Sequence, residues 1–154
     1  MSVPTWKRKI SKAEYIYRLY LLNIRLGEIF VNKPKKYKDN YTDAIIKTAL
    51  SALNHAQIAD SIYLSKYTTS YKFEIRERNL ILARGEIASV ATDSYIFLEI
   101  VRKHDYASEQ DERLFQKLYD QELEIGKMCE DCYSLISGII KSDKEAYKKY
   151  ISAK

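Results

Sequence analysis

The distribution of proline is the feature that most constrains how this chain can fold. Both prolines lie near the start, at Pro4 and Pro34, and the 154 residues contain only four glycines. Proline interrupts a helix because it lacks a backbone N–H and its ring collides with the preceding turn. Nothing from Lys35 to Lys154 therefore forbids helix. A chain of this length fits one domain with a sizeable core, so the sequence predicts a single all-α domain over residues 1–154.

The first helix is expected to begin at Ser11 and to end before Pro34. Ser11 and Glu14 have the spacing of a capping box, in which each side chain accepts a hydrogen bond from the other residue's backbone N–H. Pro34 disfavours helical backbone at Lys33. Apolar residues recur at steps of three and four, as on the buried face of a helix. They are Tyr15, Leu19, Leu22, Leu26 and Ile29.

The second helix is expected to run from a cap at Asp39 or Asn40 to about Tyr63. It carries a stripe of large residues, Ile46, Leu50 and Leu53. It also carries a stripe of small residues, Ala49, Ala52, Ala56 and Ala59. Small side chains let a neighbouring backbone come close, so this helix is expected to lie between other helices.

Two longer helices are expected to follow a turn at 65–70. One covers about 70–103 and buries a set of residues in heptad steps: Leu80, Ala83, Ile87, Val90, Ser94, Phe97 and Val101. The other starts at a cap at Ala107–Ser108 and turns these residues inward: Leu114, Leu118, Ile125, Met128, Cys132, Leu135 and Ile139. Ser142 and Glu145 repeat the capping-box spacing before a short, basic helical tail that is expected to end at Lys154.

Four helices joined by short turns favour an antiparallel up-down four-helix bundle. We expect an N-terminal arm at 1–10, the bundle at 11–141 and a basic tail at 142–154. The predicted core draws large residues from all four helices. These are Leu19, Leu26, Leu50, Leu53, Leu80, Ile87, Phe97, Leu118, Met128 and Leu135. The first helix is apolar around much of its circumference, which one bundle cannot cover, so self-association is also expected.

Composition excludes several classes of protein. No apolar run approaches the roughly 20 residues of a membrane span, the N-terminus lacks the apolar segment of a signal peptide, and two cysteines do not make a secreted disulfide scaffold. We expect a cytoplasmic protein without contact to a membrane. Cys129 and Cys132 form a C-x-x-C, but zinc needs about four ligands and only His55 and His104 could add to them. Cys132 is most simply a core residue.

No catalytic or nucleotide-binding motif is recognisable, so the chain is predicted not to be an enzyme and to need no cofactor or metal. The distribution of charge in the sequence indicates a binding function instead. Residues 1–38 carry ten Lys or Arg against two Glu, a net charge of +8, whereas the remaining residues carry 16 against 19 acids, a net charge of −3. A basic segment on a slightly acidic body indicates an anionic partner. A lysine-rich face that is merely solvated is the simpler alternative.

The candidate nucleic-acid-binding residues lie in two basic clusters and on the helix between them. Lysines neutralise phosphates and an exposed aromatic ring stacks on a base; Trp6 offers such a ring in the arm. The arm supplies Lys7, Arg8 and Lys9, and the turn after the first helix supplies Lys33, Lys35, Lys36, Tyr37 and Lys38. Arg18 and Arg25 lie seven residues apart on one face of the first helix.

Three segments together resemble a known family. They are the basic turn Pro-Lys-Lys-Tyr-Lys at 34–38, Ala-Asp-Ser-Ile-Tyr at 59–63, and Ile-Ile-Lys-Ser-Asp-Lys-Glu-Ala-Tyr-Lys-Lys-Tyr at 139–150. Over nearly its whole length the chain looks like the Avd-type four-helix bundles, the accessory variability determinants of diversity-generating retroelements. A sister group is encoded in intervening sequences of large ribosomal RNA genes.

The resemblance implies a ring-like homopentamer that binds the element's reverse transcriptase and its template RNA. Such a protein supports mutagenic cDNA synthesis without catalysing it. Lys35, Lys36 and Lys38 match the family's basic turn, and Arg18 and Arg25 match its basic first helix more loosely. The chain departs from the family in its arm and in its Tyr/Lys-rich tail. The alternatives are a bundle that binds only protein and a small phage or plasmid regulator that binds duplex DNA.

Overall fold

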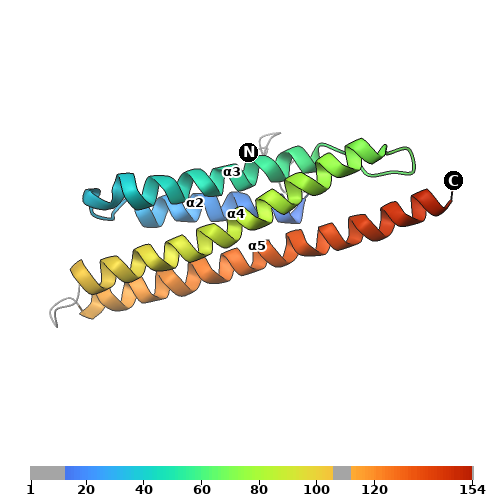
Figure 1. The fold of residues 1–154 in the computed structure, drawn as a ribbon. Helices are drawn as coiled ribbons and strands as arrows, with labels where there is room; N and C mark the ends of the chain where they lie inside the picture. Colours follow the sequence, from blue (N-terminus) through green and yellow to red (C-terminus); the bar gives the residue numbers. More distant parts are fainter. Residues whose placement is uncertain (1–12, 106–111, 154) are drawn as a thin grey trace, which may run out of the picture.

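The computed structural model describes residues 13–105 and 112–153. Every regular element in these two ranges is helical, as predicted (Figure 1). The elements are α2 (Glu14–Phe30), a 3-10 turn η1 (Lys35–Tyr37), a π-helical turn η2 (Lys38–Thr42), α3 (Asp43–Asp60), α4 (Ser70–Asp105) and α5 (Glu112–Ser152). None of these helices is both long and apolar enough to cross a membrane. The predicted all-α four-helix bundle is confirmed.

The four helices pack in a closed cycle. α3 lies against α2 and α4, and α5 lies against α4 and α2. Neighbours run in opposite directions: Tyr15 at the start of α2 meets Asp60 at the end of α3, and Arg76 early in α4 meets Asp143 late in α5. α4 and α5 are about twice as long as α2 and α3, and α5 runs past them at its C-terminal end (Figure 1).

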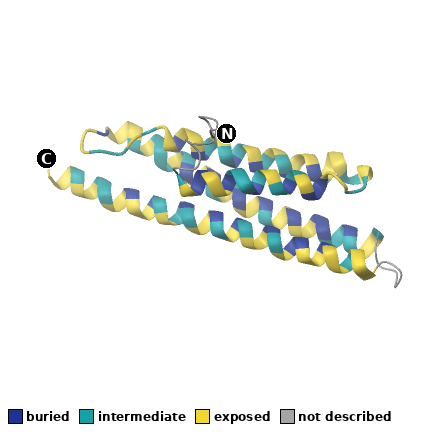
Figure 2. Ribbon diagram, turned by 180° about the vertical axis from the view of Figure 1, so that it is seen from behind, coloured by how far each residue is buried: buried dark blue, intermediate teal, exposed yellow. Residues whose placement is uncertain are grey.

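The predicted buried faces of the first and third helices are confirmed. All five stripe residues of α2 and all seven heptad residues of α4 are buried. In Figure 2 the buried positions lie on the sides of the helices that face one another. Leu19, Leu26, Leu80, Ile87, Phe97 and Leu118 are the predicted core residues that are buried.

The predicted helix starts were less accurate than the faces. α2 begins at Glu14 after Ala13, which makes no side-chain capping bond; the expected cap Ser11 lies outside the described residues. Ala107–Ser108 lies outside them as well. Asp39 and Asn40 do not cap α3, which was a wrong prediction, since both lie inside η2. The backbone is helical from Lys35 through η1 and η2 into α3, so its amides have partners without a side-chain cap.

The buried face of α3 also differs in part from the prediction. Leu50 is 48% exposed, and Leu53 and Ile46 lie at the edge of the core. The alanine stripe is fully buried, as its small side chains predicted, together with Ile45, and α3 lies between α2 and α4. Small side chains let neighbouring helices pack closely against this face, and the larger residues Leu50, Leu53 and Ile46 lie at its flank.

The end of the chain is helical as predicted, but the expected capping box is wrong. α5 continues without a break through Ser142 to Ser152, so Ser142 and Glu145 do not start a helix and the described part of the tail belongs to α5. Leu114 is exposed, and Met128, Leu135 and Ile139 are only partly buried. Leu118, Ile125 and Cys132 are buried as predicted, but Cys129, Ile136 and Ile140 are buried in place of their predicted neighbours, and the stripe continues to Asp143.

Candidate nucleic-acid interface

The basic turn between α2 and α3 is held in place by an aromatic cluster. Phe97 of α4 is fully buried, and its ring centroid lies 5.4 Å from that of Phe30 and 5.6 Å from those of Tyr37 and Tyr41. Such contacts add to the free energy gained by burial. They also engage Tyr37, which packs edge-on against Tyr41 and Phe97. In this conformation Tyr37 is half-buried and supports the turn, and its expected stacking on a base stays a prediction.

Lys33 is the least solvated of the predicted cations that the structure describes. Its Nζ donates a hydrogen bond to Oε1 of Gln121 on α5 at 2.9 Å. Burial, together with the positive charges of Lys117 and Arg25, lowers the pKa of Lys33 to about 8. Lys33 therefore begins to lose its charge just above neutral pH and lies among other cations.

Lys36 is neutralised by an acid. Its Nζ donates to Oδ1 of Asp105 at 2.7 Å and lies 5.0 Å from the ring centroid of Tyr37. The hydrogen bond to Asp105 raises the pKa of Lys36. This pair joins the turn to the end of α4.

Lys35 and Lys38 are exposed, and no ion pair is found for either among the described residues. Together with Lys33 they border a groove of about 350 Å³ that is also lined by Val31 and Ile46. These lysines are the cations of the turn that remain available to an external anion.

The two arginines of α2 are less available. Arg25 forms a two-point contact with Glu124 of α5, with Nε 2.8 Å from Oε1 and Nη2 3.0 Å from Oε2. Arg18 donates from Nε to Oε1 of Glu14 at 3.0 Å. Both lie on one face of the helix, as predicted, but each faces a carboxylate. The arm residues Lys7, Arg8 and Lys9 lie outside the described residues.

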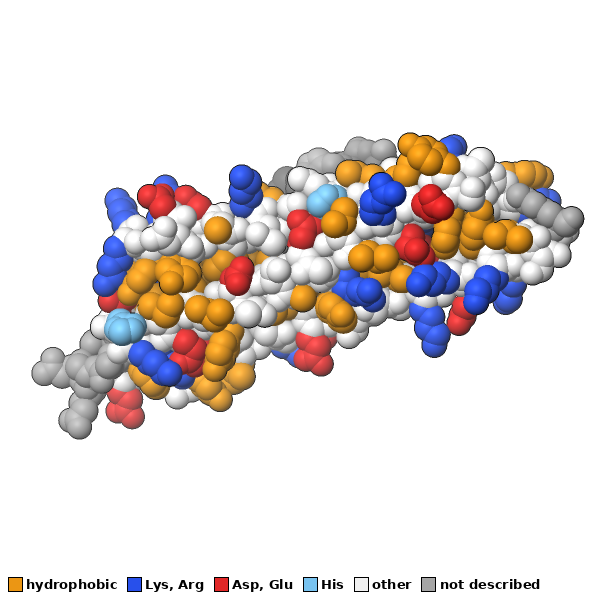
Figure 3. Space-filling model, viewed as in Figure 1, with side chains coloured by type: hydrophobic (Ala, Val, Ile, Leu, Met, Phe, Trp, Pro, Cys, Tyr) orange, Lys and Arg blue, Asp and Glu red, His pale blue; other side chains and the backbone are white. Residues whose placement is uncertain are grey.

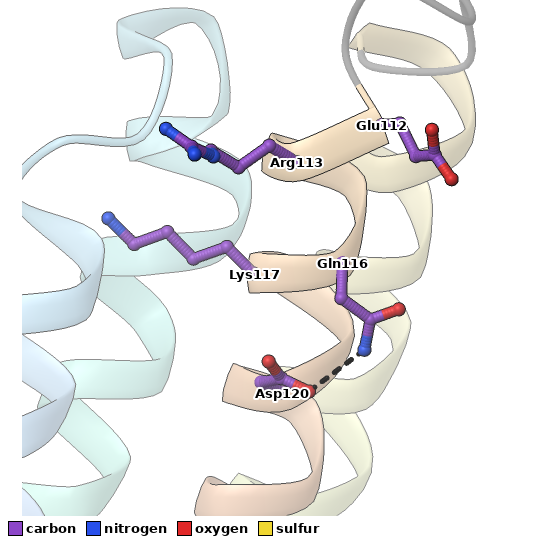
Figure 4. A pocket seen from close by; sticks show the side chains of 5 residues that line it. All are labelled: Glu112, Arg113, Gln116, Lys117 and Asp120. Atoms are coloured by element: carbon purple, nitrogen blue, oxygen red, sulfur yellow. Dashed lines mark hydrogen bonds between the residues drawn. The ribbon is translucent and has the colours of Figure 1, made fainter.

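The structure adds two cations that the sequence did not indicate. Arg113 and Lys117 project from the start of α5 toward the side of the bundle that carries α2 and its turn, whereas Glu112 and Gln116 point away from it (Figure 4). With Asp120, these four residues line a hollow of about 520 Å³. Arg113 and Lys117 are four residues apart and so share a helix face. Only the fold reveals that this face lies beside Lys33.

Another cation, on α4, is neutralised by carboxylates. Arg102 of α4 is paired with Glu99 and lies with Nε 3.9 Å from Oε1 of Glu122. Burial raises the pKa of Glu122, while the hydrogen bond from Arg102 lowers that of Glu99. The guanidinium also lies 4.7 Å from the ring centroid of Phe115. Among the described residues, the uncompensated charge discussed so far therefore lies on the face that carries Lys35, Lys38, Arg113 and Lys117.

The two cysteines lie in the core. Cys129 and Cys132 are both free and buried, which agrees with the core interpretation of Cys132. Burial raises the pKa of each thiol to about 12, so neither is a thiolate near neutral pH. No group of three His, Cys, Asp or Glu side chains in the described part of the chain is arranged to hold a metal ion.

The fold places the chain in the class of all-α, antiparallel four-helix bundles. Comparisons with protein-family models, with curated protein sequences and with solved structures found no match. The residues of the bundle and their geometry are therefore what supports a function.

Proposed function

We propose that this chain is a non-enzymatic, cytoplasmic RNA-binding protein that uses the α2–α3 turn and the start of α5 as its binding surface. The observation that carries the proposal is the gathering of like charges from distant parts of the chain. Lys33 and Lys117 are 84 residues apart in sequence, yet lie close enough for Lys117 to lower the pKa of Lys33. Cations held this close repel one another even with Asp120 nearby, and a polyanion relieves that repulsion.

RNA suits this surface better than a small anion does. Lys35 and Lys38 border an open groove, and Arg113 and Lys117 extend the basic face onto α5 (Figure 4). Separate cations along a surface fit a run of phosphates, and arginine binds a phosphate through two parallel hydrogen bonds. Duplex DNA presents the same phosphates, so it is the second substrate to test.

The resemblance to the Avd-type bundles suggests the biological process in which this binding takes place. We propose that the protein assembles with a retroelement reverse transcriptase and its template RNA and so supports mutagenic cDNA synthesis. Lys35 and Lys38, which match the family's basic turn, are among the available cations. Arg18 and Arg25, the looser match, have their charge taken up by Glu14 and Glu124.

Self-association is the second part of the proposal, and five copies are favoured by the resemblance. It is supported by an apolar face on α2 and α3. Ile24, Val31 and Leu50 are 43%, 75% and 48% exposed, and Val31 and Ile46 border one groove between the two helices. A ring would repeat the basic surface and raise avidity without adding a different kind of interaction. The same face would serve a different protein if the chain is a protein scaffold.

Fluorescence anisotropy with a labelled structured RNA tests the binding. The double variant Lys35→Gln/Lys38→Gln should bind more weakly, and its affinity should depend less steeply on salt. The slope of log affinity against log salt should fall by about 0.7 to 0.9 for each phosphate that the variant no longer neutralises. Lys47→Gln/Lys127→Gln removes the same charge from positions away from the turn and should change little.

Two results would overturn the proposal. One is a wild-type protein that binds neither RNA nor duplex DNA at low salt. The other is equal weakening by the two double variants, which would mean that the turn lysines act only through the overall charge of the protein. Co-purification of a single protein in the absence of any nucleic-acid binding would favour the scaffold.

A further inference from the structure

The end of the bundle opposite the basic turn carries the most exposed tyrosines among the described residues. We call it the far end: the 61–69 loop, α4 up to Arg78, and α5 from Lys141 to its last turn (Figure 1). Tyr63, Tyr67 and Tyr71 are 86%, 79% and 71% exposed. A buried tyrosine ring would contribute a large apolar area to the core. Three such rings left in solvent within nine residues therefore call for a partner.

The loop that carries two of these rings is ordered by its own hydrogen bonds. Thr68 is buried at its centre. Its hydroxyl accepts a bond from the backbone N–H of Ser65 at 2.8 Å and donates one to the carbonyl of Tyr63 at 3.2 Å. The backbone N–H of Tyr67 donates to Oγ of Ser65 at 3.2 Å. The backbone of such a loop is ordered before a ligand arrives, which lowers the entropy cost of binding.

Positive charge surrounds the rings. Residues 61–78 and 141–153 contain eight Lys or Arg against four acids. Arg76 pairs with Asp143 and Lys144 approaches Glu77, which leaves six cations against two acids. In Figure 3 Lys and Arg side chains lie along this end with apolar side chains between them. The far end is thus rich in positive charge even after its ion pairs are set aside.

The fold brings the cations of α5 beside the tyrosines. Phe73 of α4 and Tyr147 of α5 stack with their centroids 4.2 Å apart and their planes 7° from parallel. This contact fixes Tyr71 and Lys72, just before Phe73, next to the turn of α5 that carries Lys148 and Lys149. Lys66 adds a cation on the loop itself, with Nζ 5.1 Å from the ring centroid of Tyr67.

We propose that the far end binds single-stranded nucleic acid, with unpaired bases stacked on Tyr63, Tyr67 and Tyr71. The phosphates between them would lie against Lys66, Lys72 and the lysines of α5. Stacking requires a free base face, which a duplex does not offer, so aromatic rings among cations select single strands. This surface shares no residue with the α2–α3 turn, so it does not depend on the function proposed for that turn.

The test is the affinity for two labelled 20-nucleotide probes of the same length, an unstructured oligouridine and a blunt RNA duplex. The wild type should prefer the single strand. Tyr63→Ala/Tyr67→Ala/Tyr71→Ala should lower affinity for oligouridine by about fivefold or more for each ring that stacks and abolish the preference. These rings are exposed, so circular dichroism should show an unchanged helical content. Tyr17→Ala/Tyr95→Ala/Tyr133→Ala removes three other exposed rings and should change little.

A second measurement locates the contact directly. Ultraviolet crosslinking to a 5-bromouridine probe, followed by trypsin, should label the peptide Tyr67–Lys72, which is released by cleavage after Lys66 and Lys72. Lys35→Gln/Lys38→Gln should keep both the label and the single-strand preference, even if it weakens duplex binding. An unchanged preference in the triple tyrosine variant would overturn the proposal. Binding of that surface to phosphatidylserine vesicles, with oligouridine affinity unaffected by the tyrosines, would also overturn it and assign the surface to lipid.

Discussion

Arg76 of α4 and Asp143 of α5 form a nearly buried ion pair, with Nε 2.6 Å from Oδ2 and Nη2 3.3 Å from Oδ1. The same guanidinium donates from Nη1 to the backbone carbonyls of Ala59 and Ile62, at 3.2 and 2.9 Å. It therefore gives a donor to the Ile62 carbonyl just beyond α3 and a further donor to the Ala59 carbonyl in the last turn of α3. One side chain joins three of the four helices.

Removing Asp143 should therefore destabilise the protein strongly. Asp143→Ala leaves the Arg76 charge buried without its partner, and such changes cost about 3–5 kcal/mol. Urea unfolding followed by circular dichroism measures the free energy of unfolding. Asp131→Ala breaks the exposed pair with Lys127 and should cost under about 1 kcal/mol. Equal destabilisation by the two variants would contradict the role given to Arg76.

The packing of α3 on alanine gives a second prediction. Ala52→Leu forces a larger side chain between closely packed backbones and should cost about 1–3 kcal/mol. Leu50→Ala removes a side chain that is 48% exposed and should cost less than the roughly 2–5 kcal/mol of a core Leu→Ala change. Leu26→Ala, which empties a fully buried position, supplies that reference. If Leu50→Ala matches Leu26→Ala, the register of α3 is wrong.

The lowered pKa of Lys33 predicts a pH dependence of stability. Because its folded pKa of about 8 is below the ordinary value of about 10.4, the folded state binds fewer protons than the unfolded state between these values. The free energy of unfolding of the wild type should therefore rise relative to Lys33→Met as the pH rises from about 8 to about 10.4. Lys47→Met, on the outer side of α3, should run parallel to the wild type. A constant difference between wild type and Lys33→Met would mean that the pKa is not lowered.

The two cations at the start of α5 can be tested apart from the turn. Arg113→Gln/Lys117→Gln should weaken binding to structured RNA and reduce the salt slope by about 0.7 to 0.9 for each phosphate left without its cation. It should leave helical content unchanged, because both side chains are exposed. Lys127→Gln, further along the same helix, is the control. Wild-type affinity in the double variant would restrict the binding surface to the turn.

The exposed face of α2 and α3 predicts the assembly state. Light scattering at micromolar concentration should give a mass of about five times 18.1 kDa. Ile24→Glu/Leu50→Glu should reduce that mass to a monomer without unfolding the chain. Ile81→Glu/Ile96→Glu places the same charges at comparably exposed positions of α4 and should leave the mass unchanged. A wild-type monomer at high concentration would remove the ring from the proposed function.

The sequence predicted the helices of this bundle better than their registers. The lack of proline after Pro34 and the heptads of α4 were sufficient because both are local patterns. On α3 the alanine stripe was correctly predicted to face neighbouring helices, but Leu50 and Leu53 were wrongly placed in the core because side-chain size was taken as a sign of burial, whereas the separation between helices decides it. In α5 apolar residues occur at adjacent positions, such as Met128 with Cys129 and Leu135 with Ile136, so two registers fit the pattern equally.

The candidate site was predicted less well, because charge in a sequence does not reveal its partner. Arg25 is cancelled by Glu124, 99 residues further along the chain, and Tyr37 turns toward Phe97. Conversely, Lys117 was taken for part of the acidic body, and the fold sets it beside Lys33. The far-end tyrosines did carry a visible signal: they alternate with Lys66 and Lys72, as Tyr37 does with its lysines.

The unbroken course of α5 fixes a length scale for anything that the protein holds. Its 41 residues rise about 1.5 Å each, so the helix measures about 60 Å from the side of the basic turn to the far end. That distance equals about 18 base pairs of B-form duplex at about 3.4 Å per step. A nucleic acid much shorter than this can occupy one end of a subunit at a time, whereas a longer one that includes a single-stranded segment can reach both ends. The length of α5 would then decide which nucleic acids can contact both ends of one subunit.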